Sequence, residues 1–147
     1  MELTMAEQIT PSNDVLLKAV HDTLVISTTD LQGVITYAND LFCKLTGYSR
    51  EELIGQPHNL VRHPAVPKEV YKDMWDTIQA GKIWTGIVPN VGKGGVVYVV
   101  DTTVQPIFDA EGKITSYISV RRVINDLMQN FDAVELSKEI FDDFYDK

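Results

Sequence analysis

Three long β-forming runs fill the C-terminal half of the chain, and this pattern limits the fold more than any other feature of the sequence. The runs cover residues 84–91, 96–104 and 114–123, and the turn sequences GKGG and DAEG separate them. Short turns that contain glycine join neighbouring antiparallel strands, so we expect two consecutive hairpins. Pro89 cannot donate a hydrogen bond to a neighbouring strand, which places the first run at a sheet edge or at a bulge.

The first third of the chain predicts one more hairpin. Residues 24–28 and 34–37 are rich in apolar and β-branched side chains, and the turn sequence DLQG lies between them. A short helix is expected before this hairpin, because the sequence PSND at residues 11–14 is typical of a helix start.

Helix start and stop signals occupy the middle of the chain. Asn39 is a suitable N-cap for a helix that ends at Gly47, and the pair Ser49 and Glu52 matches a capping box. Pro67 suits the first turn of a longer helix, whose apolar residues recur at helical spacing: Val70, Tyr71, Met74, Trp75 and Ile78. The order strand, strand, helices, three strands predicts an α+β domain. Its five-stranded antiparallel sheet should carry helices on one face and flanking terminal helices.

Length, charge and cysteine content exclude several classes of protein. The 147 residues suit one domain with tails: an N-terminal tail and short helix at 1–21, a domain at 22–124, and an amphipathic helix or linker at 125–147. With 13 Lys and Arg against 21 Asp and Glu, the net charge is -8, which argues against nucleic acid and anionic membrane surfaces as partners. Cys43 is the only cysteine, so no disulfide forms within the chain and a reducing compartment is expected. No apolar run approaches the ~20 residues of a membrane span, and the polar start is unlike a signal peptide.

Residues 58–90 concentrate side chains that suit a flat, phosphate-bearing ligand. Arg62 and His63 are suitable for a pyrophosphate, because a guanidinium pairs with two phosphate oxygens; the alternative for Arg62 is an ion pair with one of the many acidic residues. His58 follows a proline at a helix start, where histidine serves either as a ligand contact or as a capping or packing residue. A metal site needs three or four ligands, and no cysteine or carboxylate support is evident. Haem needs one axial histidine and stays an alternative.

Two tryptophans and an amide complete this set. Trp84 and Asn90 fall on one face of the expected strand, because side chains alternate along a strand. A ring and an amide on one face suit the plane and the edge of a flat ligand, while the alternative role for Trp84 is to close the core. Trp75 belongs to the apolar stripe of the long helix, for which core packing is the ordinary role.

Longer stretches of the chain resemble a known family. They read TLVISTTDLQGVITYAND at 23–40, GYSREELIGQPHNLVRHPAVP at 47–67, DMWDTIQAGKIWTGIVPN at 73–90 and SYISVRR at 116–122. Together with the order of elements, they are similar to a PAS domain, and in particular to the FAD-binding PAS domain of bacterial aerotaxis receptors. The resemblance implies a PAS fold that holds FAD noncovalently and reports redox state or oxygen to a downstream signalling module. It also implies a cofactor site at the matching positions Asn39, His58, Arg62, His63, Trp75, Trp84 and Asn90.

Three places depart from the family pattern. Ala65 stands where the family has an acidic residue, residues 91–92 stand where it has basic residues, and Val99 stands where PAS strands commonly have tryptophan. These differences remove possible phosphate partners and a possible wall or stacking surface. The reactive cysteine of blue-light flavin PAS domains is also missing after Gly55, and Cys43 is expected to be a small core residue.

The sequence as a whole predicts a cytoplasmic sensory PAS domain. We expect FAD as its cofactor, a second copy as its dimer partner, a signalling module of the same protein downstream, and no contact with nucleic acid or membrane. The alternatives are a flavin-free PAS domain that dimerises or relays a signal, and a haem or small-ligand sensor on the same fold. No Ser-His-Asp set, CxxC motif or phosphate loop is evident, so we expect no enzyme activity.

Overall fold

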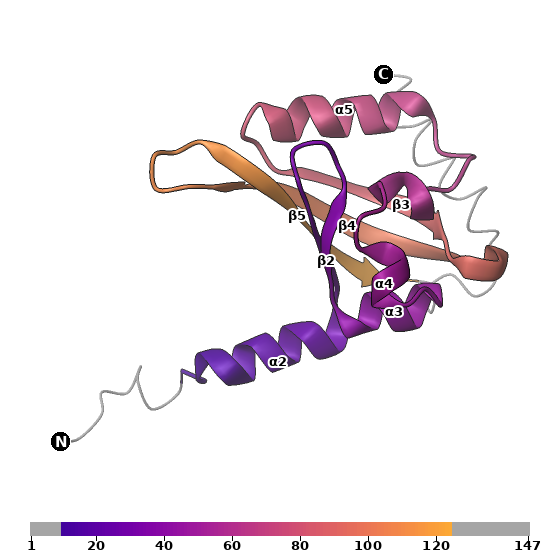
Figure 1. Cartoon of the computed structure of the whole chain (residues 1–147), viewed down its shortest axis with the longest axis horizontal. Helices are drawn as coiled ribbons and strands as arrows, with labels where there is room; N and C mark the ends of the chain where they lie inside the picture. Colours follow the sequence, from indigo (N-terminus) through magenta and orange to yellow (C-terminus); the bar gives the residue numbers. More distant parts are fainter. Residues whose placement is uncertain (1–9, 125–147) are drawn as a thin grey trace.

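The computed structural model describes residues 10–124, and its centre is a five-stranded antiparallel sheet (Figure 1). The strands are ordered β2-β1-β5-β4-β3, so the first strand of the chain lies beside the last. Their bounds are β1 Val25–Thr29, β2 Ile35–Ala38, β3 Trp84–Val91, β4 Val97–Phe108 and β5 Ile114–Val123. The predicted fold class is confirmed. Residues 1–9 of the expected N-terminal tail and the expected helix or linker at 125–147 lie outside the described residues.

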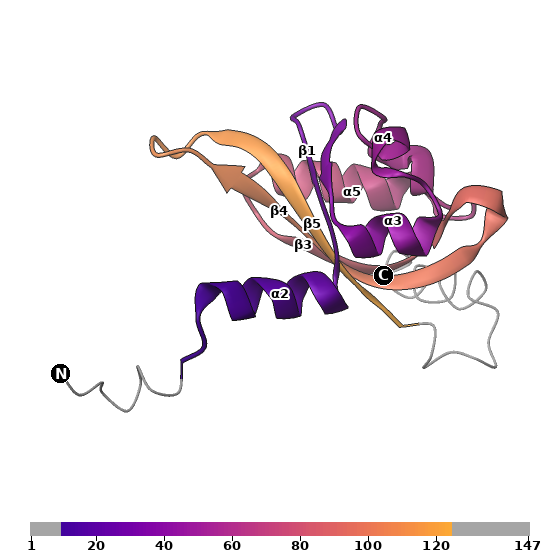
Figure 2. The same cartoon turned by 60° about the horizontal axis from the view of Figure 1, so that its bottom comes forward.

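Helices α3, α4 and α5 cover one face of the sheet, whereas α2 projects away from it (Figure 2). The helical elements are α2 Asn13–Thr23, α3 Asp40–Thr46, α4 Arg50–Leu53, the 3-10 turn η1 His58–Val61 and α5 Lys68–Gln79. The predicted caps are present: Asn39 Oδ1 accepts from the Phe42 N–H at 3.1 Å, and Ser49 and Glu52 form the capping box. Gly47 ends α3 in the left-handed region. Within residues 10–124, no helix has the length and apolar content that crossing a membrane requires.

Strand β4 is longer than the sequence indicated. The expected strand ended at Val104, but pairing with β5 continues to Phe108. Pairing with β3 stops at Val104, so β4 has an open edge beyond that residue. Pro106 therefore removes no hydrogen bond to β3, which explains why proline is tolerated there. Pro89 follows the same rule, because β3 is an edge strand, as predicted.

One connecting segment, residues 55–62, contacts both edges of the sheet, and we name it the edge strap. At the β2 edge, the Ile35 N–H donates to Gln56 O at 2.8 Å. At the β3 edge, Arg62 and Asn90 form an isolated antiparallel bridge. The turn η1 lies between these two anchors. The edge strap therefore brings η1 over the inner face of the sheet.

Two groups of buried side chains form the core. The first joins α5 to strands β3, β4 and β5, and it includes Val70, Ile78, Trp84, Val88, Tyr98 and Tyr117. The second joins β1 and β2 to α3 and α4, and it includes Val25, Ile35, Phe42, Leu53 and Val61. Members of both groups line the cavity described next.

Candidate ligand-binding cavity

A cavity of about 300 Å³ lies between the inner face of the sheet, α5 and the edge strap. Every strand except β2 contributes to its lining, together with the turn between β1 and β2. Small-molecule sites occupy roughly 300–1,000 Å³. The cavity is therefore large enough for one compact ring system.

Three side chains form a polar cluster beside the cavity: Ser27 of β1, His58 of η1 and Arg121 of β5. Arg121 is 1% exposed. One of its terminal nitrogens donates to Ser27 Oγ at 2.7 Å, and the other lies 3.0 Å from His58 Nε2. His58 Nε2 also lies 3.0 Å from Ser27 Oγ. The ring of Phe42 stacks on the His58 imidazole and lies 4.4 Å from Arg121 Cζ, so the cluster rests on an apolar floor.

The polar cluster determines the protonation of His58. A guanidinium has donors only, so His58 Nε2 must accept from Arg121, and the imidazole proton lies on Nδ1. Burial, followed by the charge of Arg121, lowers the pKa of His58 to about 3. Burial also lowers the pKa of Arg121 to about 10. At neutral pH the cluster therefore contains a neutral imidazole and a buried cation.

Two buried donors at the cavity have no partner among residues 10–124. Arg121 Nε and Thr102 Oγ1 form no hydrogen bond with any described residue. No carboxylate among residues 10–124 pairs with Arg121 either. Leaving a buried polar group unpaired costs about 1–3 kcal/mol. Both residues line the cavity, so the site favours a ligand that brings acceptor atoms or negative charge to them.

Four aromatic side chains supply a large part of the apolar lining, and we name them the aromatic wall: Tyr71 and Trp75 of α5, Trp84 of β3, and Tyr117 of β5. Trp75 and Tyr117 meet edge to face, with ring centroids 5.6 Å apart. The Trp84 indole N–H donates to Asp73 Oδ2 at 3.1 Å. Trp84 is thus both a core residue and a cavity residue. Rings held in this way offer contact area to a flat ligand without loss of side-chain freedom.

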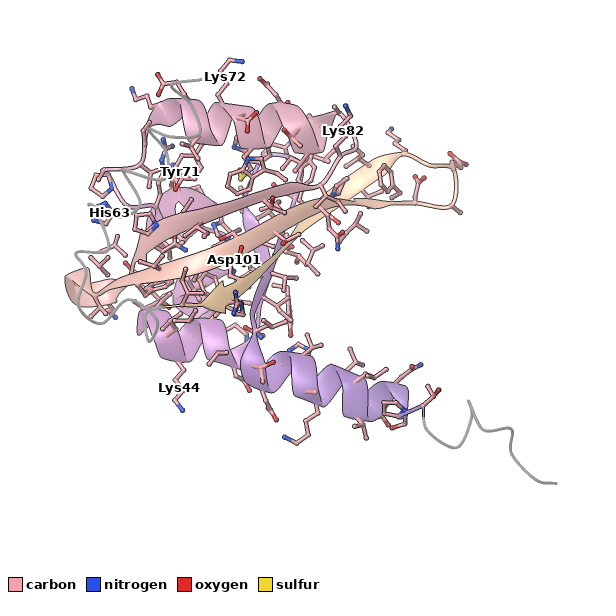
Figure 3. The ribbon with its side chains drawn as sticks, turned by 180° about the vertical axis from the view of Figure 1, so that it is seen from behind. Lys44, His63, Tyr71, Lys72, Lys82 and Asp101 are labelled. Carbon is pink, nitrogen blue, oxygen red and sulfur yellow. The ribbon has the colours of Figure 1, made fainter. Side chains whose placement is uncertain are left out.

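Arg62 lies at the end of the edge strap next to β3. Its guanidinium carbon is 3.8 Å from the centroid of the Tyr71 ring, which is a cation–π contact. Figure 3 shows Tyr71 on the sheet side of α5, whereas Lys72 points away from the sheet. Burial raises the pKa of Tyr71 to about 12, so this phenol stays neutral. Arg62 forms no ion pair within residues 10–124, which leaves its charge available to an anionic ligand group.

Five of the seven residues proposed from the sequence line this one cavity: His58, Arg62, Trp75, Trp84 and Asn90. Asn39 and His63 do not line it. The Asn39 side chain caps α3 and also bonds to the start of β1, accepting from the Ile26 N–H at 3.1 Å and donating to Leu24 O at 2.8 Å. His63 Nδ1 accepts from the Ala65 N–H at 3.0 Å in the loop before α5.

Sequence reasoning did not single out Arg121, Thr102 or Ser27. One signal for Arg121 was present in the strand pattern. Side chains alternate along a strand, so Tyr117, Ser119 and Arg121 share one face of β5. An arginine on the buried face of a strand is uncommon unless it has a partner there.

One departure from the family pattern has no effect on the cavity. Val99 lies on the face of β4 opposite to Tyr98 and Val100, and it does not line the cavity. The expectation that its missing tryptophan removes a cavity wall is therefore wrong.

A second departure, at Gly92, has a steric reason. A Cβ there would stand 2.7 Å from Thr46 O, so a basic side chain fits only if the backbone moves.

Comparison with known proteins assigns the family. Residues 16–124 match the family model described as PAS fold. The chain is 48% identical over 114 residues to the aerotaxis receptor of Escherichia coli (strain K12), which covers 78% of this chain and 22% of the receptor. It is 35% identical over 102 residues to a nitrogen fixation regulatory protein of Klebsiella pneumoniae, which covers 69% of this chain and 21% of that protein.

A solved PAS domain from Colwellia psychrerythraea gives a TM-score of 0.67 at 27% identity, over 76% of this chain and 95% of that one. The chain belongs to the PAS family. It spans about a fifth of the length of the two curated relatives, at 22% and 21%.

Proposed function

We propose that this PAS domain is a cytoplasmic redox or oxygen sensor that binds FAD noncovalently and signals to a downstream module of the same protein. The names of two relatives, an aerotaxis receptor and a nitrogen fixation regulatory protein, support a sensory role. The observation that carries the proposal is that one cavity combines flat aromatic rings with buried donors that have no partner in the described part of the chain.

The lining residues fit a flavin. An isoalloxazine is flat and largely apolar and has acceptor atoms along one edge, which suits the aromatic wall and the donors Arg121 Nε and Thr102 Oγ1. Asn90 adds an amide that both donates and accepts. A volume of about 300 Å³ suits the ring system better than a whole dinucleotide. The diphosphate is therefore assigned to Arg62, whose charge has no carboxylate partner in the described range.

FAD, if bound, would supply the redox chemistry of this site. The charge of Arg121 stabilises negative charge that arises beside it, because screening inside the protein is weak. A shift of this guanidinium acts directly on Ser27 of β1 and on His58 of the edge strap. Since the edge strap contacts both sheet edges, the polar cluster has a direct connection to the outer strands.

The hydrogen-bond contacts of His58 argue against haem. His58 is the histidine that lines the cavity among the described residues. Its Nε2 lies 3.0 Å from both Arg121 and Ser27, and its Nδ1 carries the proton. An axial ligand needs a free imidazole nitrogen.

Absorption spectroscopy and mass spectrometry of the purified protein test the proposal. We expect flavin absorption bands, and FAD released by acid or heat and identified by its mass. Preparations that stay colourless after repeated incubation with FAD would contradict flavin binding and support a relay role. A Soret band would instead show haem.

A second copy of the chain is the proposed dimer partner. Helix α2 projects from the sheet with Val15, Leu16 and Leu17 exposed at 58%, 46% and 56%. Apolar side chains grouped on a surface mark interaction sites. Sedimentation of the same preparation should give a dimer that Leu16→Asp weakens, and a monomer at all concentrations would rule the dimer out.

A further inference from the structure

Trp84 lies flat against its own strand, over Gly86. A Cβ built on Gly86 would stand 2.5 Å from Cη2 and 2.7 Å from Cζ2 of the indole. Cβ contacts under 3.0 Å are essentially never found in proteins. No side chain therefore fits at position 86 while the Trp84 ring keeps its place.

The backbone at Gly86 does not itself need glycine. Gly86 is not among the glycines with positive φ, and it pairs with Thr102 in the middle of β3. Glycine in a strand interior weakens the strand, because it adds no packing and has the most freedom to lose. By contrast, Gly33 lies against Trp75 but also has φ +84°, so its backbone alone explains the glycine. At Gly86, where the backbone allows any residue, the position of the Trp84 indole is what requires glycine.

Trp84 has little freedom to move elsewhere. Its N–H is held by Asp73 of α5 at 3.1 Å, the residue is 6% exposed, and it faces the cavity. Gly86 follows Trp84 on the same inner face of β3. A Cβ added there points away from the sheet, so it would lift the indole off the strand toward α5 and the cavity.

We propose that Gly86 is a specificity-determining residue of the cavity, because it lets the Trp84 ring lie flat and leaves room for a planar three-ring cofactor. This inference rests on the proposed function. A side chain at position 86 would narrow the cavity by displacing one member of the aromatic wall. The cofactor class that fits is thus set by a residue that offers the ligand no functional group.

Flavin titrations of four proteins test this: wild type, Gly86→Ala, Trp84→Phe and the double variant. Phenylalanine lacks the indole atoms that the new Cβ would meet. We expect Gly86→Ala to weaken flavin affinity about tenfold or more in the wild type, as overpacking does, and less than about twofold in the Trp84→Phe background. Equal losses in both backgrounds, or no loss in the wild type, would overturn the proposal. Thr85→Ala, on the opposite face of β3, is the matched control and should bind like the wild type.

The indole N–H signals of the flavin-free protein give a readout that does not depend on cofactor. The chain has 2 tryptophans, so two signals are expected. Gly86→Ala should move the Trp84 signal and leave that of Trp75 nearly in place. If the wild type binds no flavin, the proposed function fails, and these signals still decide whether Gly86 positions the ring. An unmoved Trp84 signal would overturn the inference.

Discussion

Two arginines line the cavity, and their surroundings differ. Arg121 is enclosed by Ser27, His58 and Phe42 and is 1% exposed. Arg62 is half-buried at the end of the edge strap and stacks on Tyr71. Neither pairs with a carboxylate within residues 10–124. The difference between the two sites is therefore the extent of screening by water.

This contrast separates two kinds of response. A charge inside the protein acts strongly on its neighbours and on their protonation, so the Arg121 region should respond to pH and to the charge of the cofactor. A charge near water is weakened by salt, so the Arg62 region should respond to ionic strength and to the presence of phosphate. The same residue type is thus expected to respond differently at two depths.

The largest expected effect is the pH dependence of stability caused by His58. Its folded pKa of about 3 lies below the ordinary value of 6.5, so the unfolded chain takes up a proton first as the pH falls. The stability from neutral His58 is present above about pH 6.5 and is lost progressively as the pH falls from there to about 3. Between pH 7 and pH 5 the free energy of unfolding should fall by about 2 kcal/mol. Urea unfolding of the wild type and of His58→Gln measures this.

The His58→Gln variant should lose this part of the pH dependence, because glutamine accepts from Arg121 without titrating. High salt should not restore stability at pH 5, since the group is buried. A wild type whose stability is flat between pH 7 and pH 5 would show that His58 protonates freely in the folded protein.

The second effect concerns the buried cation. Arg121→Met should weaken flavin binding by about tenfold to a hundredfold, because a hydrogen bond to a charged group contributes about 1.5–3 kcal/mol. The flavin-free variant should be as stable as the wild type or more so, since a buried charge is replaced by an apolar side chain of similar length. The midpoint potential of any bound flavin should become more negative.

Arg122→Met is the matched control for this experiment. Arg122 is the next residue and faces the other side of β5, where one of its terminal nitrogens lies 3.4 Å from Oδ2 of the half-buried Asp101. It should leave affinity and potential unchanged. Equal effects of the two substitutions would mean that overall charge matters and burial does not.

The smallest effect is expected at Arg62. Arg62→Ala should weaken FAD binding about tenfold and leave riboflavin binding nearly unchanged, because riboflavin has no diphosphate. Added salt should reduce the difference, since Arg62 is half-buried. Calorimetry with both ligands measures it. Similar losses for FAD and riboflavin would show that Arg62 shapes the cavity through Tyr71 and does not bind phosphate.

Sequence rules that act over a few residues predicted the helices and strands well. Residues whose role depends on tertiary contacts were not predicted. Caps at Asn39 and Ser49 and the edge position of Pro89 follow from backbone chemistry that operates over a few residues. The polar cluster does not, because Ser27 and Arg121 meet only when β1 and β5 pair. The same holds for Gly86, whose role depends on the rotamer of Trp84. The sequence thus named cavity residues within 58–90 and missed those that the other strands supply.

The sheet order also has a consequence for synthesis of the protein in the cell. Strand β1 pairs with β5, and Val25 lies opposite Arg121, so the first strand made must wait for the last. Contacts between distant parts of a chain form slowly, because the loop between them must close first. On the ribosome, β1 and β2 therefore emerge before β5, the strand that pairs with the other edge of β1. Arg121 belongs to the strand that completes the sheet, so the lining of the cavity is complete only once β5 has paired with β1.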